Sequence, residues 1–115
     1  SVLLEENKFV EADNMAYQAM LSAARALIKT EWLDVPADPG VIVSEFRKRF
    51  VDKKLFVAKF AGADFAAYLF LRHERGANGA DRESARQVVE ESQLFIEAAH
   101  DCQSRLQKEI SGIKV

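Results

Sequence analysis

Residues 14–30, NMAYQAMLSAARALIKT, decide the fold that this sequence predicts. Their apolar members recur at steps of three and four residues, which places them on one face of an α-helix. They are Met15, Ala16, Ala19, Met20, Ala23, Ala24, Leu27 and Ile28. Many of these side chains are small, so the backbone of a second helix can approach closely. The spacing therefore predicts a core-facing helix against which other helices pack.

The first helix should begin at about Phe9, and the conformation of residues 1–8 is left open. Pro36 and Pro39 forbid a continuous helix beyond it, because proline lacks the backbone N–H that the helix interior needs. Asp38 followed by Pro39 is a helix-start signal, since aspartate accepts free backbone N–H groups and proline fits the first turn. A second helix is therefore predicted to run from this signal to about Phe50.

A third helix is predicted over residues 63–73, after a loop at 53–60 and before a loop that contains glycine. Asp81 can cap a fourth, long helix. The buried seam of that helix should be Ala85, Val88, Ser92, Phe95, Ala99, Cys102 and Leu106. No internal repeat or alternating β pattern is present. The sequence therefore predicts a single all-α domain, an up-and-down bundle of four main helices.

Composition limits the possible classes of function. The 115 residues suit one domain, and a net charge of -2 gives no overall attraction to nucleic acid or to anionic membranes. The one cysteine, Cys102, excludes an internal disulfide and a cysteine-ligated cluster, and we expect it to be a small buried hydrophobe. No metal site is predicted, because His73 and His100 are the only histidines and neither begins a ligand-spaced motif.

No apolar run is long enough to span a membrane, and the first residues lack the layout of a signal peptide. We therefore expect a cytoplasmic protein that does not contact a membrane. The chain starts at Ser1 rather than at methionine, and our expectation is a domain excised from a longer polypeptide.

The densest polar cluster is Arg72, His73, Glu74 and Arg75, at the end of the third predicted helix. An arginine can clamp a phosphate and a histidine can transfer protons near neutral pH, so Arg72 and His73 are the candidate catalytic residues. Arg72, Arg75 and Asn78 are the candidate ligand-binding residues. We favour a second interpretation, in which these cations only complement the helix dipole and bond its last carbonyls.

A basic run that extends from the end of the second predicted helix into the following loop is the other candidate site. It comprises Arg47, Lys48, Arg49, Lys53 and Lys54. Such a run could meet RNA or an acidic partner protein, but the neighbouring aromatic residues fall at helical spacing and are expected to face the core. We interpret the run as a solvated face, and nucleic-acid binding is not expected.

Three segments carry a resemblance to a known family. They are AYQAMLSAARALI at residues 16–28, VIVSEFRKRF at 41–50 and LFLRHER at 69–75. These resemble the first helix, the second helix and the arginine-bearing end of the third helix in the HEPN family of small helical domains. Active HEPN ribonucleases have an arginine, a spacer of four to six residues and a histidine. Arg72 matches the arginine, but no histidine stands at 77, 78 or 79, and counting from Arg75 gives none either. This departure argues against ribonuclease activity.

The segment PGVIVSEFRKRF at residues 39–50 is similar to HEPN-like domains at the C-terminus of bacterial nitrite/sulfite reductases. That resemblance implies a non-catalytic accessory domain that contacts the upstream domains of its parent protein or a second copy of itself. Sirohaem and the iron–sulfur cluster, with the oxidoreductase activity, would belong to the preceding domains, and this domain would carry no cofactor. The alternative is a HEPN ribonuclease or nucleotide-binding domain centred on Arg72 and His73.

Overall fold

The computed structural model describes the backbone of residues 2–52, 66–76 and 81–113, and the side chains of 8–52, 67–76 and 81–107. Its elements in chain order are α1 (Val2–Ile28), α2 (Pro39–Phe46), the π-helical turn η1 (Arg47–Val51), α3 (Ala66–Arg75) and α4 (Arg82–Ile113). The predicted all-α bundle of four main helices is confirmed for these residues. The predicted loop at 53–60, residues 63–65 of the predicted third helix, and Asn78 lie outside the described residues.

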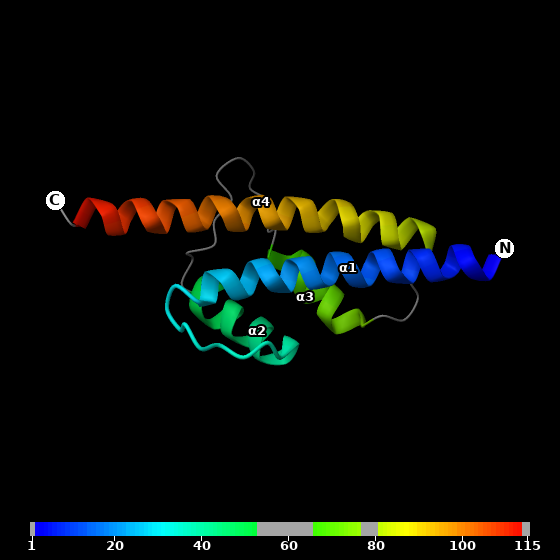
Figure 1. The fold of residues 1–115 in the computed structure, drawn as a ribbon, viewed down its shortest axis with the longest axis horizontal. Coiled ribbons are helices and arrows are strands. Elements are labelled where there is room, and N and C mark those ends of the chain that lie inside the picture. Colours follow the sequence, from blue (N-terminus) through cyan, green and yellow to red (C-terminus); the bar gives the residue numbers. More distant parts are fainter. Residues whose placement is uncertain (1, 53–65, 77–80, 114–115) are drawn as a thin grey trace.

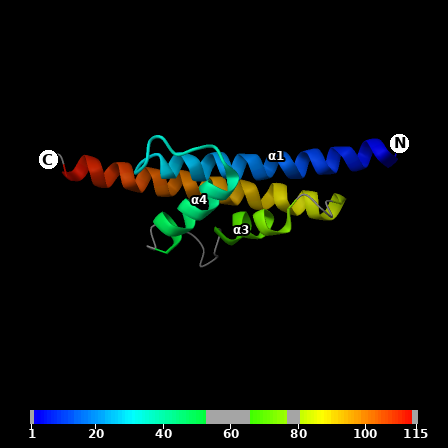
Figure 2. The same ribbon diagram turned by 90° about the horizontal axis from the view of Figure 1, so that it is seen from below.

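The two long helices, α1 and α4, lie side by side and form the body of an elongated molecule of 61 × 30 × 20 Å. They run in the same direction, and α2, η1 and α3 pack on one side of the pair (Figures 1 and 2). The connection at residues 29–38 runs back along α1 before α2 begins (Figure 1). This return places α2 beside α1 and removes one reversal of direction between the first and last helices. The first and last helices are therefore parallel, so this pair departs from the alternating order of the up-and-down arrangement expected from the sequence.

Helix α1 begins earlier than predicted, at Val2 rather than at about Phe9. Residues 2–8 contain neither glycine nor proline and are rich in leucine, glutamate and lysine, which favour helix. The predicted core face is confirmed at its centre, where Ala16, Met20, Ala24, Leu27 and Ile28 are buried, with Leu21 added. The prediction is wrong for Met15, whose side chain is 66% exposed, because successive helix residues are rotated by about 100°.

Aromatic side chains fill the core between the helices. Phe46 of α2 and Phe50 of η1 stack with ring centroids 5.9 Å apart, and Phe95 of α4 lies 5.5 Å from Phe46. All three rings are fully buried, which contributes roughly 1.5–3 kcal/mol each. The predicted seam of α4 is confirmed, with Cys102 buried in it as a small hydrophobe and Leu106 partly buried. His100 is exposed.

Local capping bonds fix the helix starts that the sequence indicated. The Asp38 carboxylate accepts a hydrogen bond from the Val41 N–H at 3.1 Å, at the start of α2. At the start of α4, Asp81 accepts from the Ser84 N–H at 2.8 Å, and the Asp81 N–H donates to the Ser84 hydroxyl at 2.9 Å. Hydrogen bonds donated to the exposed Asp81 carboxyl by the backbone and the side chain of Ser84 hold its pKa below the ordinary value of 3.8. Gly76, with φ +72°, takes the left-handed conformation that commonly ends a helix, just after α3.

Two arginines fasten the returning connection to the bundle. The Arg25 guanidinium donates to the Val35 carbonyl oxygen at 2.9 Å, and the Val35 side chain is buried. Arg49 of η1 pairs with Glu31 at 3.2 Å, and its guanidinium carbon lies 5.6 Å from the centroid of the Trp32 ring. These contacts place the start of α2 and thereby the position of η1. Within the described residues, no helix is both long enough and apolar enough to cross a membrane.

Candidate functional site

The sequence-predicted site residues Arg72, His73 and Arg75 all lie in the last turn of α3. Each of them contacts α1 rather than forming only a solvated cap. The contacted side chains on α1 are Asp13 and Tyr17, which share one face of the helix because they are four residues apart, with Asn14 beside them. We call these six residues the polar cluster.

The centre of the polar cluster is an ion pair between Asp13 and Arg72. The Arg72 Nε donates to Asp13 Oδ2 at 2.8 Å, and Arg72 Nη2 lies 2.7 Å from the same oxygen. Asp13 is 0% exposed and Arg72 is 4% exposed. Two charges are therefore held out of water together, a state that is stable only when both partners are present.

Further groups complete the bonding around this pair. Arg75 pairs through Nη2 with the other carboxylate oxygen, Asp13 Oδ1. Arg72 Nη2 also donates to Asn14 Oδ1 at 2.9 Å, and the Arg72 guanidinium carbon stands 4.5 Å from the centroid of the Tyr17 ring. The buried carboxylate thus has partners on both oxygens, while the guanidinium combines polar bonds with a cation–π contact.

Tyr17 links the ion pair to His73. Its hydroxyl oxygen lies 2.5 Å from His73 Nδ1, and the two ring centroids are 6.1 Å apart. When the Tyr17 O–H donates to Nδ1, the proton of the neutral imidazole is on Nε2. Burial raises the pKa of Tyr17 above its ordinary value of 10.0, and the nearby positive charge of Arg72 opposes part of that rise.

This geometry describes what the predicted site residues can do chemically. The Arg72 guanidinium is buried and bonded within the protein, so a phosphate would have to displace Asp13 and Asn14 to reach it. Arg75 keeps a partly exposed side chain but also pairs with Asp13. Asn78 lies outside the described residues. The cluster joins α1 to α3, and helix-dipole complementation alone does not account for it.

Sequence reasoning missed Asp13, on which the whole cluster converges. A signal was present, since Asp13 stands three residues before Ala16 and seven before Met20. It therefore continues the apolar face of the first helix, and a charged residue there requires a buried partner. No local pattern indicates which cation that partner is, because Arg72 is 59 residues away along the chain.

The basic run is divided by the structure. Arg49 is paired with Glu31 and Glu45, at 3.2 and 3.6 Å, so it is not a simple solvated cation. Arg47 and Lys48 are exposed, as predicted, and the Arg47 guanidinium carbon lies 4.2 Å from the centroid of the Phe70 ring. Lys53 and Lys54 lie outside the described residues.

Among the residues that the structure describes, no group of three or more histidine, cysteine, aspartate or glutamate side chains is placed to hold a metal ion. Fold and polar cluster together define the class of protein: an all-α bundle whose first and third helices are joined by a buried ion pair. Comparisons of the chain with protein-family models, with curated proteins and with solved structures gave no match.

The substitution Asp13→Asn tests the ion pair. It keeps the shape of the side chain but leaves the Arg72 charge buried without a carboxylate, so the free energy of unfolding should fall by about 3–5 kcal/mol. Urea denaturation measures this loss. The exposed Asp34→Asn is the control and should change stability by less than about 0.5 kcal/mol. A loss for Asp13→Asn as small as that of the control would contradict the structural role assigned here.

The raised pKa of Tyr17 predicts a dependence of stability on alkaline pH. The unfolded chain loses the phenolic proton at lower pH than the folded protein, so this stabilisation is complete below about pH 10 and declines as pH rises through the raised pKa. Unfolding free energies measured from about pH 9 to pH 11 should therefore fall more steeply for the unsubstituted protein than for Tyr17→Phe. Tyr68→Phe is the control and should keep the steep fall; equal slopes for all three proteins would refute the prediction.

Proposed function

We propose that this chain is a non-catalytic helical interaction module that binds a protein partner through the open face of α1. The observation that carries the proposal is Met15, a large apolar side chain that is 66% exposed on the helix that forms the core. Large apolar side chains gathered at a surface mark interaction sites more often than isolated ones do. The surroundings of Met15 therefore decide the argument.

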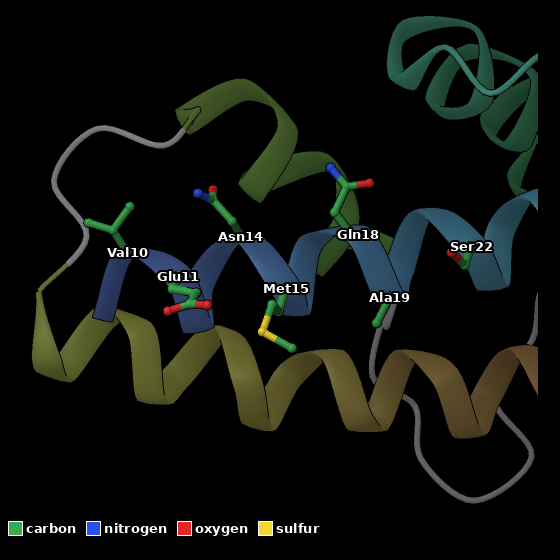
Figure 3. Close-up of a pocket in the computed structure, with 7 residues that line it drawn as sticks. All are labelled: Val10, Glu11, Asn14, Met15, Gln18, Ala19 and Ser22. Atoms are coloured by element: carbon green, nitrogen blue, oxygen red, sulfur yellow. The ribbon is translucent and has the colours of Figure 1, made fainter. Parts of the chain in front are cut away.

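Met15 lies in an open groove of about 610 Å³ along α1 (Figure 3). Its lining residues are Val10, Glu11, Asn14, Met15, Gln18, Ala19 and Ser22. Glu11 is the one charged residue among them, and Ala19 and Ser22 leave a shallow region beside the larger Val10 and Met15. The groove runs from Val10 to Ser22, about 20 Å along α1, so it offers several helical turns of contact for another helix.

The occupant that best fits this groove is the same groove of a second copy of the chain. Large side chains, Val10 and Met15, lie toward one end, and small ones, Ala19 and Ser22, lie toward the other. A two-fold axis that sets two α1 helices antiparallel brings Met15 of each copy over Ala19 and Ser22 of the other. The large side chain of each copy then packs against the small side chains of the other, and these small residues allow the two helix axes to come close. The resulting homodimer is our proposed assembly.

The polar cluster supports an interaction module over a nuclease or nucleotide-binding domain centred on Arg72 and His73. Arg72 is bonded to Asp13 and Asn14 and is 4% exposed, and His73 is bonded through Nδ1 to Tyr17. The side chains that such chemistry would use are engaged in holding α3 against α1. This arrangement stabilises the scaffold that displays the groove.

We further propose, from the resemblance of residues 39–50 to reductase-associated HEPN-like domains, that the module follows a sulfite or nitrite reductase in its parent protein. The complete reading frame tests this proposal directly. A sirohaem-binding reductase sequence encoded upstream of Ser1 is the expected result. A different kind of domain at that position would contradict it, without bearing on self-association.

The substitution Met15→Glu tests the groove as a self-association surface. Two carboxylates would be brought into an apolar interface with no counter-charge, so the dimer dissociation constant should rise at least tenfold, about 1.4 kcal/mol. Sedimentation velocity over a range of protein concentrations measures the monomer–dimer equilibrium.

Leu33→Glu is the matched control, because Leu33 is also a large exposed apolar residue, at 75%, but lies outside the groove. It should leave the dissociation constant unchanged. Circular dichroism checks that both variants keep their helices. A protein that is monomeric at every concentration, or a dimer that Met15→Glu leaves intact, would overturn the proposed homodimer.

A further inference from the structure

A second cleft lies between α3 and the α2–η1 segment. It has a volume of about 400 Å³. One wall is a single helical face of α2 and η1, formed by Gly40, Val43, Ser44, Arg47 and Lys48, with Asp52 following η1. The other wall is a face of α3, formed by Phe70, His73 and Glu74. The cleft shares no residue with the α1 groove.

Two cations that line this cleft, Arg47 and Lys48, are not used in the ion pairs that hold the described part of the fold together. Neither Arg47 nor Lys48 forms an ion pair with any carboxylate that the structure describes, whereas the adjacent Arg49 has two such partners. The Arg47 guanidinium is held over the Phe70 ring, with its carbon 4.2 Å from the ring centroid. This contact orients the guanidinium at the wall of the cleft while leaving its N–H groups without a described carboxylate.

His73 also lines this cleft, and its ring can offer a third donor when the proton is on Nε2. Its Nδ1 is bonded to the Tyr17 hydroxyl on the α1 side, and the residue also lines the cleft. With Tyr17 donating to Nδ1, the ring N–H is at Nε2, which is the nitrogen left for a ligand. The polar cluster therefore orients the His73 ring through Nδ1 and makes no described bond to Nε2.

The wall formed by α2 and η1 contains an unusual backbone turn. η1 is a π-helical turn, closed by the hydrogen bond from the Asp52 N–H to the Arg47 carbonyl oxygen at 2.8 Å. Such turns are rare within helices and occur frequently at functional sites. This one carries Arg47 and Lys48 and places Asp52 beside them at the cleft.

We propose that the cleft between α3 and α2–η1 binds a small phosphomonoester whose organic part carries hydroxyl or amino groups. Arg47, Lys48 and the His73 N–H provide donors for the three terminal oxygens of the phosphate. Asp52 and Glu74 accept hydrogen bonds from the hydroxyl or amino groups, and they disfavour a second phosphate. Phe70, which lines the cleft beside Arg47, offers an apolar surface for the carbon skeleton. This site goes beyond the proposed interaction function and does not depend on it.

Titration of the ¹⁵N-labelled chain followed by NMR tests the proposal, with glucosamine 6-phosphate as the probe. Resonances of α2, η1 and the end of α3 should shift and reach saturation. Glucosamine at the same concentrations should produce no saturable shift, because it lacks the phosphate. Inorganic phosphate should bind at least about tenfold more weakly than the sugar phosphate, because it cannot engage Asp52 and Glu74.

Lys48→Ala is the main variant, since Lys48 is exposed and its removal should not disturb the core. It should weaken binding of glucosamine 6-phosphate at least about tenfold. Arg82→Ala is the matched control: it removes another exposed cation, at the start of α4, and should leave the affinity unchanged.

Three results would overturn the proposal. Changes in chemical shift that increase linearly with the concentration of glucosamine 6-phosphate, without saturation, would show only a general attraction between charges. Equal affinity for inorganic phosphate and glucosamine 6-phosphate would refute the role of the two carboxylates and the proposed ligand class. An affinity unaffected by Lys48→Ala, or reduced equally by Arg82→Ala, would place the binding elsewhere.

Discussion

The buried ion pair between Asp13 and Arg72 is the interaction on which the arrangement of the helices depends. It lies where α1 meets α3, and neither charge can remain out of water without the other. This requirement fixes the short helix α3 in both position and rotation against the long helix α1. The rotation of α3 also decides which of its residues face α2 and η1. The cleft between α3 and the α2–η1 segment therefore depends on the same ion pair.

Helix α1 presents a different chemistry on each of its sides. Its apolar side forms the core with α4 and α2, and the Asp13 and Tyr17 side receives the cations of α3. The side that includes Met15 and Ala19 is left open as a groove (Figure 3). Asn14 belongs to two of these surfaces, because it accepts a bond from Arg72 and also lines the groove. The polar cluster and the proposed partner surface are thus joined through Asn14.

Much of the fold could be predicted from the sequence, and less of the site. The periodicity predicted all four helices, and the capping residues Asp38 and Asp81 predicted two of their starts, because these signals act within a few residues. Arg72, His73 and Arg75 were recognised as a polar group, but their partners on α1 were not. Their bonds join segments more than 50 residues apart, and local patterns carry no information about which distant side chains will meet.

The sequence by itself determined the helical class, the seam of α4 around Phe95 and the burial of Cys102, because side-chain hydrophobicity at helical spacing fixes which face leaves water. Only the tertiary structure decided that α1 and α4 run in parallel, that Met15 faces outward and that Asp13 holds two arginines. The physical reason is that spacing defines a stripe on one helix but not its rotation against its neighbours. That rotation is set by side chains from several helices packing together and by the need to pair a buried charge.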